Sequence, residues 1–318
     1  MNRFRRVQLV VTAVVPVALC APTALAGGEP KNVAPFTRPA APVHVQLAAA
    51  SAATSTAARR SSQPVYQPPQ RYYLALGDSI AYGYQPTKKP GARPAAFETG
   101  YVDVFAARLR KLSPKIQLVN YGCPGESTAT FTGGGCPASA DGFKLHDAFR
   151  GSQLRAALSF LRSHRGQVSP VTLTLWGNDW LPVVLDECKN DVACIRAHAP
   201  ARIASFGARL TSILRQLRAA APSAEIIVTG AWDLEPEQLE QLARVYRSLD
   251  ASIARAASAA GARVAEALPV FNPRGSTRLQ TARLCTLTFI CSKGDPHPTD
   301  TGYRALADAF MRASGYRQ

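Results

Sequence analysis

The stretch YYLALGDSI, residues 72–80, decides the fold prediction for this chain. Its first part, Tyr72–Leu76, is a short apolar run that is typical of a buried strand. Ser79 follows this strand directly after Gly77 and Asp78. Open α/β sheets carry their reactive groups at the C-terminal ends of strands, so Ser79 stands where a nucleophile is expected. Gly-Asp-Ser also occurs in many turns, and the tripeptide alone establishes no chemistry.

Strand-like and helical patterns alternate along the rest of the chain. Short apolar runs predict strands at residues 73–76, 116–120, 171–176, 225–229 and 263–266. Helical spacing of apolar residues predicts helices at 102–112, 153–162, 203–219, 238–260 and 301–313, the last one capped by Thr299 or Asp300. This alternation predicts an α/β fold, in which a parallel sheet of five strands is covered by helices on both faces.

Four small or polar residues each follow a predicted strand, namely Ser79, Gly122, Asn178 and Asp233. Because the C-terminal ends of parallel strands meet at one edge of a sheet, we expect these residues to lie close together at a crevice. His297 lies in the loop that leads into the last predicted helix.

A serine hydroxyl needs an adjacent base to act as a nucleophile, and histidine is the usual base near neutral pH. His297 lies between Pro296 and Pro298, two residues after Asp295, and this setting favours a catalytic role. The other four histidines lack such a context, and we expect surface or structural roles for them: His44, His146, His164 and His198.

Four segments, taken together and in this order, resemble the sequence blocks of the GDSL or SGNH hydrolase superfamily: GDSI at 77–80, NYG at 120–122, WGND at 176–179 and DPHP at 295–298. The resemblance covers roughly residues 72–313. It implies a three-layer, flavodoxin-like α/β/α sandwich and a serine ester hydrolase of the secreted bacterial lipase or esterase type. It also implies that Ser79 is the nucleophile and His297 the base. The implied oxyanion donors are the backbone N–H groups of Ser79 and Gly122 and the side-chain amide of Asn178.

The chain departs from the family pattern at the residue that orients the histidine. The family places an acid three residues before the histidine, where this chain has Gly294, and Asp295 lies only two residues before it. Two alternatives follow: Asp295 reaches the imidazole from a tight turn, or a backbone carbonyl orients a Ser79–His297 dyad. We favour Asp295. Two other acids, Asp78 and Asp179, are expected to brace their loops by bonds to the backbone.

The N-terminal segment has the features of a secretory signal peptide. Arg3, Arg5 and Arg6 precede an apolar run at residues 9–19, and Ala24-Leu25-Ala26 supplies a cleavage site. Residues 27–70 are rich in Ala, Pro, Ser and Thr, which predicts a disordered linker. The catalytic domain is therefore predicted at 71–318, and the protein is predicted to be secreted.

Cysteine usage agrees with export. Without Cys20, six cysteines remain in three close pairs. Pairing within each close pair is the simplest of the 15 connectivities that six cysteines allow. It gives the disulfides Cys123–Cys136, Cys188–Cys194 and Cys285–Cys291. Zinc binding is the alternative, but the sequence has neither CxxC nor His-rich spacing.

The formal net charge is +16, and removal of a signal peptide with three arginines and no acid leaves about +13. The basic residues are spread along helical segments without a nucleic-acid motif, which favours a solvated basic face with an anionic membrane or cell-wall polymer as a neighbour. Since GxSxG, HExxH and P-loop motifs are absent, we expect neither a metal nor a nucleotide cofactor. We also expect a monomer.

The substrate is less sharply defined by the sequence. Residues 124–135 and 180–183 are expected to wall the pocket, while Phe131, Phe149 and Trp180 either line an acyl site or belong to the core. The resemblance to secreted lipases modestly favours a fatty-acyl ester or phospholipid. Two alternatives stay open, a polysaccharide O-acetylesterase of the same fold and a non-catalytic cell-surface binding module.

Overall fold

The computed structural model describes residues 68–235 and 238–316. Contacts divide the chain into two units, Met1–Gln63 and Pro64–Gln318, and every described residue belongs to the second unit. The predicted signal peptide, residues 1–26, lies outside the described residues. The same holds for all but the last three residues of the predicted linker, 27–70.

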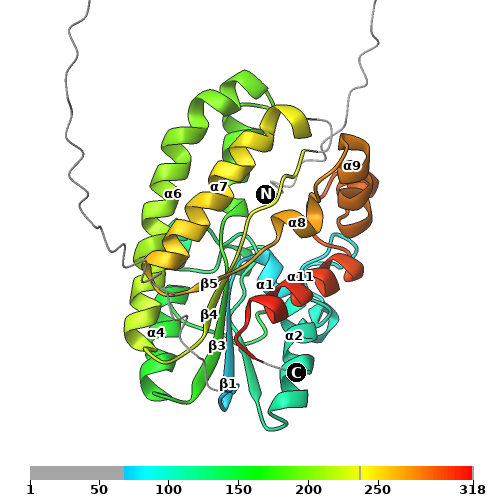
Figure 1. The fold of residues 1–318 in the computed structure, drawn as a ribbon. Helices are drawn as coiled ribbons and strands as arrows, with labels where there is room; N and C mark the ends of the chain where they lie inside the picture. Colours follow the sequence, from blue (N-terminus) through cyan, green and yellow to red (C-terminus); the bar gives the residue numbers. More distant parts are fainter. Residues whose placement is uncertain (1–67, 236–237, 317–318) are drawn as a thin grey trace, which may run out of the picture. The chain divides into compact units, whose positions relative to one another are not determined.

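Five strands form one parallel sheet in the order β2-β1-β3-β4-β5 (Figure 1). The strands are β1 Tyr72–Gly77, β2 Gln117–Asn120, β3 Val168–Thr174, β4 Ile226–Thr229 and β5 Arg263–Ala265. In the central register, Ala75 of β1 lies between Asn120 of β2 and Thr172 of β3. The predicted five-stranded parallel sheet is confirmed, and its strand order is the flavodoxin-like one.

Helices cover both faces of this sheet. The longer ones are α2 Tyr101–Leu112, α4 Gln153–Ser163, α6 Val192–Ala220, α7 Leu239–Ala259, α9 Thr277–Leu287 and α11 Asp300–Ala313. The shorter ones are α1 Ser79–Tyr82, η1 Pro94–Phe97, α3 Thr128–Gly133, η2 Pro137–Ser139, α5 Gly177–Pro182, the π-helix η3 Val183–Glu187, α8 Leu268–Phe271 and α10 Ile290–Lys293. Thr299 caps α11, because its side chain accepts a hydrogen bond from the Gly302 N–H.

Two elements differ clearly from their predicted bounds. Helix α6 begins at Val192, eleven residues before the predicted start, because Asp191 caps it and Pro200 does not interrupt it. Strand β3 begins at Val168, ahead of Pro170, and ends two residues early because Trp176 precedes the first turn of α5. The second difference brings Asn178 into a helix rather than a loop.

The helices form two layers around the sheet. Helices α4, α6 and α7 lie on one face, and α2 and α11 lie on the other (Figure 1). Every residue of β3 is buried, which is the pattern of a strand covered on both faces. Across the second layer, the Tyr101 ring of α2 stacks on the Phe310 ring of α11 at 4.3 Å between centroids. The three-layer sandwich that the sequence predicted is therefore confirmed.

The sheet topology determines where a crevice forms. From β1 the chain moves outward to β2, then returns across β1 to β3 and continues toward β5. The C-terminal ends of β1 and β3 therefore flank the point at which the chain direction switches, where open α/β sheets bind ligands. Ser79 follows β1 and Asn178 follows β3, so the topology brings these two residues together.

The structure contains the three predicted disulfides, Cys123–Cys136, Cys188–Cys194 and Cys285–Cys291. Each one closes a short loop and joins no distant elements. Among the described residues, no helix has the length and apolar character that a membrane crossing requires.

Candidate active site

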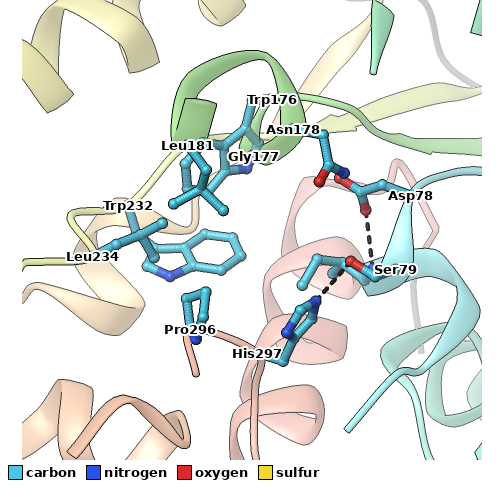
Figure 2. Close-up of a pocket in the computed structure, with 11 residues that line it drawn as sticks. Asp78, Ser79, Trp176, Gly177, Asn178, Leu181, Trp232, Leu234, Pro296 and His297 are labelled. Atoms are coloured by element: carbon cyan, nitrogen blue, oxygen red, sulfur yellow. Dashed lines mark hydrogen bonds between the residues drawn. The ribbon is translucent and has the colours of Figure 1, made fainter. Parts of the chain in front are cut away.

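A continuous chain of hydrogen bonds connects three of the predicted site residues. The Nε2 atom of His297 lies 2.7 Å from the Oγ atom of Ser79, and its Nδ1 atom lies 2.7 Å from Oδ1 of Asp295. Figure 2 shows the His297 ring hydrogen-bonded to the Ser79 hydroxyl at one side of the pocket. All three residues are largely buried but not sealed, since 8% of Ser79 is exposed and the other two side chains are exposed by about a fifth.

Ser79 is held by the turn between β1 and α1. Asp78 caps α1 by accepting the Ile80 N–H at 3.0 Å, and it also accepts the Thr174 hydroxyl at 2.9 Å. This is the bracing role that the sequence predicted. Burial raises the pKa of Asp78 to about 6, although these two hydrogen bonds oppose the shift.

A second brace comes from α4. The Gln153 side chain accepts the Gly77 N–H at 2.6 Å and donates to the Gly77 carbonyl at 3.0 Å and to the Glu126 carboxyl at 2.9 Å. Gly77 has φ +124°, and a Cβ there would lie 2.2 Å from the Thr174 carbonyl, so only glycine fits this turn. Ser79 is therefore positioned by side chains from two other elements of the fold.

A tight turn brings the Asp295 carboxylate to the His297 imidazole, although the two residues are only two positions apart. Asp295 Oδ1 accepts the backbone N–H of His297 at 2.9 Å and contacts the imidazole Nδ1 with the same oxygen. Burial alone would raise the pKa of Asp295, but the hydrogen bond and charge of His297 outweigh it and leave the pKa lowered. The Tyr84 ring packs edge-on against the imidazole at 4.5 Å between centroids. The geometry thus favours Asp295, not a backbone carbonyl, as the orienting group.

Asn178 lies in the first turn of α5 and lines the pocket together with Ser79. One N–H of its amide donates to the Glu126 carbonyl at 2.9 Å, which leaves the second N–H for another acceptor. The Ser79 backbone N–H donates no hydrogen bond within the described part of the chain. Two donors are therefore available beside the Ser79 hydroxyl.

The structure does not favour Gly122 as the third donor. Its N–H already donates to the Asn120 side chain at 2.8 Å, and Asn120 in turn donates to the Ala81 carbonyl. A Cβ at Gly122 would lie 2.6 Å from the Tyr82 nitrogen, so glycine is needed there for close packing under α1. Gly125, three residues on, has φ +83°, and its N–H donates no hydrogen bond within residues 68–235 and 238–316. The sequence signal for it is the second glycine of GCPG, residues 122–125.

Apolar side chains enclose the rest of the pocket, which has a volume of about 50 Å³. They are Ile80, Trp176, Leu181, Trp232, Leu234 and Pro296. The Trp232 indole stacks on Phe271 at 4.5 Å between centroids. It meets the Trp176 ring, which also lines the pocket (Figure 2), edge-on at 4.8 Å. Trp232 is thus packed between two other aromatic rings.

Most of the predicted wall residues lie elsewhere. Phe131 and Trp180 are buried in the core, and Phe149 packs against Tyr121. Of the two segments expected to wall the pocket, only 180–183 contributes, through Leu181, and no residue of 124–135 lines it. Sequence reasoning missed Trp232 and Leu234 because the loop after β4 carries no recognisable motif.

Asp233 lies at the predicted edge but does not line the pocket. Its backbone is tied to Asn272, whose side chain accepts the Asp233 N–H at 2.8 Å and donates to the Asp233 carbonyl. Burial, and then the neighbouring Glu235, raise the pKa of Asp233 to about 8. Asp233 therefore holds the loop that presents Trp232 and Leu234.

The described residues contain one group of three metal-donor side chains, formed by Cys188, Cys194 and His198. The two cysteines are joined in a disulfide, so they offer no thiolate to a metal. His146 and His164 contact backbone carbonyls, of Tyr82 and Phe160 respectively, as structural histidines do.

The fold and the four sequence blocks define an SGNH hydrolase. Residues 75–305 match the model of the GDSL-like Lipase/Acylhydrolase family, and the chain belongs to this family. No curated protein matches the chain at a significant level.

Solved structures agree with this fold. The phospholipase A1 from Streptomyces albidoflavus NA297 superposes with a TM-score of 0.53 at 20% identity, over 77% of this chain and 100% of that one. A lipase from a goat rumen metagenome gives 0.52 at 18% identity, over 77% and 98%. A variant of an acetyl xylan esterase from Geobacillus stearothermophilus gives 0.50 at 17% identity, over 78% and 96%. At these identities the likeness concerns the fold alone.

Proposed function

We propose that this protein is an exported serine hydrolase that cleaves carboxylic esters through Ser79, His297 and Asp295. The observation that carries the proposal is the unbroken chain of two 2.7 Å contacts from the Ser79 hydroxyl through the imidazole to the Asp295 carboxylate. A serine, its base and the group that orients the base are the groups that nucleophilic acyl transfer uses in serine hydrolases. A pure binding module would need none of these contacts.

The proposed reaction has two stages, formation and hydrolysis of an acyl-serine. His297 Nε2 takes the Ser79 proton as Oγ attacks the ester carbonyl, and Asp295 stabilises the imidazolium that forms. The developing oxyanion is held by the Ser79 N–H and the free amide N–H of Asn178. The Gly125 N–H, which has no partner within the described residues and is next to the Glu126 carbonyl that Asn178 binds, is our candidate for a third donor instead of Gly122. His297 then gives its proton to the leaving alcohol. Water attacks the acyl-serine by the same steps in reverse, with His297 again the base.

The pocket favours a short acyl chain. A cavity of about 150 Å³ lined by apolar side chains accommodates a benzene molecule. The pocket beside Ser79 measures about 50 Å³ and is lined by the buried Trp232. We therefore propose an acyl group of a few carbons, instead of the fatty chain that the sequence modestly favoured. The same volume keeps a polysaccharide O-acetylesterase as the second candidate, because an acetyl group fits it.

Export, partners and oligomeric state are part of the proposal. Three disulfides support a location in an oxidising compartment outside the cytoplasm. The net charge of +16, about +13 without the predicted signal peptide, supports an anionic membrane or cell-wall polymer as the neighbouring surface. We propose a monomer acting on a small-molecule ester with a short acyl group, and not on the lipid ester that the sequence also allowed.

Nitrophenyl esters of graded chain length test the function. The full chain should hydrolyse acetyl and butyryl esters faster than octanoyl or palmitoyl esters, and Ser79→Ala should abolish turnover at unchanged circular dichroism. Trp232→Ala should shift the preference toward longer chains, because it removes a large side chain that lines the pocket. Activity of Ser79→Ala near that of the wild type would end the serine-hydrolase proposal. Release of acetate from acetylated glycans, without turnover of butyryl esters, would favour the O-acetylesterase.

A further inference from the structure

Helix α5, which carries Asn178, has little to hold it in place by itself. It spans only Gly177–Pro182, ends in a proline and continues directly into a π-helix. Trp176 precedes it without a side-chain cap. A helix this short derives its position from its surroundings. An oxyanion donor, however, must be held within a fraction of an ångström of its working position.

Two consecutive residues of α5 are bonded to the segment that follows Gly125. Asn178 donates to the Glu126 carbonyl at 2.9 Å. Asp179 accepts both the backbone N–H of Thr128 at 2.8 Å and its hydroxyl at 2.5 Å. The Asp179 side chain is 5% exposed and Thr128 is fully buried, so these bonds are shielded from water.

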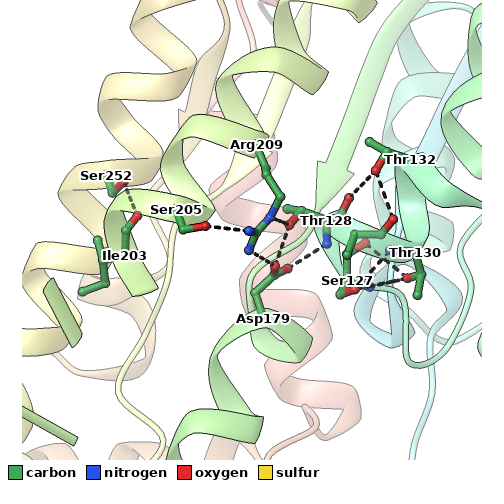
Figure 3. Close-up of polar contacts among 10 residues, drawn as sticks. Ser127, Thr128, Thr130, Thr132, Asp179, Ile203, Ser205, Arg209 and Ser252 are labelled. Carbon is green, nitrogen blue, oxygen red and sulfur yellow. Dashed lines mark hydrogen bonds and ion pairs between the residues drawn. The ribbon is translucent and has the colours of Figure 1, made fainter. Parts of the chain in front are cut away.

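Arg209 of α6 completes this network from the third side. Its Nε donates to the Thr128 hydroxyl at 2.6 Å, and one terminal nitrogen reaches Asp179 Oδ1 at 3.0 Å. The other terminal nitrogen donates to the Ser205 hydroxyl at 2.7 Å. Figure 3 shows the guanidinium group inserted between Ser205 and the Asp179–Thr128 pair. The three nitrogens therefore each have a separate partner in one plane, a geometry that lysine does not reproduce.

We infer that Arg209 is a positioning residue for the oxyanion site, acting through Asp179 and Thr128 on the placement of Asn178. The inference rests on the proposed function, because it takes Asn178 as an oxyanion donor. Helix α6 is 29 residues long and packs along α7, so it offers a fixed frame. Without the guanidinium, the Asp179 carboxylate keeps only the two Thr128 donors and loses its countercharge in a buried setting. The first turn of α5 then moves relative to Ser79, and Asn178 moves with it.

The kinetic signature separates this role from general stabilisation. The oxyanion charge develops only in the transition state, so a displaced Asn178 lowers kcat and leaves KM nearly unchanged. We expect Arg209→Ala to lower kcat by roughly 10–100-fold, since a misplacement of about 1 Å costs up to about 100-fold. Arg209→Lys keeps the charge but not the planar guanidinium, so its kcat should lie between those of Arg209→Ala and the wild type. The lysine variant also replaces the alanine variant in the assay if the latter folds poorly.

Arg215→Ala is the matched control. Arg215 lies on the same helix, is exposed and makes no ion pair among the described residues, so its removal changes the charge equally without touching the network. We expect its kcat to equal that of the wild type. Thermal unfolding of all variants checks that the folded fraction is the same in each assay.

A double-mutant cycle with Asn178→Ala decides between the inference and its alternatives. If Arg209 acts through Asn178, adding Arg209→Ala to Asn178→Ala should change kcat by less than about twofold. Additive losses, or a KM effect alone, would overturn the positioning role while leaving the proposed hydrolase intact. If Asn178→Ala itself leaves kcat unchanged, the oxyanion assignment fails, and the inference about Arg209 fails with it.

Discussion

Asp78 and Asp295 make the same local turn on opposite sides of the site. Each carboxylate accepts the backbone N–H two residues further on, of Ile80 at 3.0 Å and of His297 at 2.9 Å. Their remaining contacts differ. Asp78 meets the neutral hydroxyl of Thr174, and burial raises its pKa to about 6. Asp295 meets an imidazole, which lowers its pKa against the effect of burial.

The comparison shows how one sequence motif serves two purposes. The turn at Asp78 is braced by side chains from other elements, namely Gln153 and Thr174, and it fixes Ser79, the proposed nucleophile. The turn at Asp295 is tied to Phe289 by backbone hydrogen bonds, and it keeps a charge beside His297, the proposed base. The Asp78 carboxyl, whose partner is the neutral Thr174 hydroxyl, acts as a structural brace. The Asp295 carboxyl, whose partner is the ionisable His297 ring, can stabilise a positive charge on that ring.

Isosteric amide substitution should produce the largest contrast between the two turns. Asp295→Asn should lower kcat by up to ~10⁴-fold, because it removes the charge that stabilises the imidazolium. Asp78→Asn should lower kcat by less than about tenfold, because an amide oxygen still accepts the Ile80 N–H and the Thr174 hydroxyl. Steady-state kinetics with nitrophenyl acetate measures both values.

His297→Ala is the control for this pair and should be inactive under every model. If Asp295→Asn costs less than about tenfold beside an inactive His297→Ala, the site is a Ser79–His297 dyad. A backbone carbonyl then orients the ring, and the contrast between the two aspartates disappears.

Because Gln153 of α4 braces the turn that carries Ser79, its removal should lower the stability of the fold. Gln153→Ala removes the partner of the buried Gly77 N–H and of one Glu126 carboxyl oxygen. Each buried group left unpaired costs roughly 1–3 kcal/mol in the free energy of unfolding. Urea denaturation of Gln153→Ala, with the exposed Gln216→Ala as control, measures the effect. Equal midpoints for the two variants would show that the turn at Asp78 does not depend on α4.

The opposite pKa shifts predict opposite dependences of stability on pH. The folded-state pKa of Asp78 lies above its ordinary value of 3.8, so its contribution is full below about pH 4 and is lost as the pH rises through about 6. The loss amounts to about 3 kcal/mol. The pKa of Asp295 is lowered, so its contribution is present above its ordinary pKa and is lost on further acidification.

Unfolding free energies between pH 3 and pH 7.5 test both signs against the matching asparagine variants. Relative to Asp78→Asn, the wild type should lose stability as the pH rises from 4 to 7. Relative to Asp295→Asn, it should lose stability as the pH falls below 4. The same sign for both aspartates would contradict the comparison.

The sequence predicted the parts of this molecule that depend on local pattern. The five strands follow apolar runs, and Ser79, Asn178 and His297 lie in recognisable blocks after them. Asp295 was predictable as well, because a two-residue turn is a local matter. These features require only the identity of neighbouring residues.

The sequence did not predict features that depend on contacts between residues far apart in the chain. Gly122 follows a strand as an oxyanion donor should, but the Asn120 side chain takes its N–H. Trp232 lines the pocket and packs against Phe271 and Trp176, and the loop after β4 contains no motif that predicts this packing. The Gln153 brace joins positions 76 residues apart, which no periodicity encodes.

The strand lengths have a consequence for behaviour at high concentration. The outer strands β2 and β5 have only four and three residues, whereas the inner strand β3 has seven. An exposed edge strand can pair with another chain through its unpaired backbone N–H and C=O groups. A short edge strand has few such groups. The protein should therefore resist edge-to-edge aggregation, a useful property for an enzyme that is stored or immobilised in concentrated form.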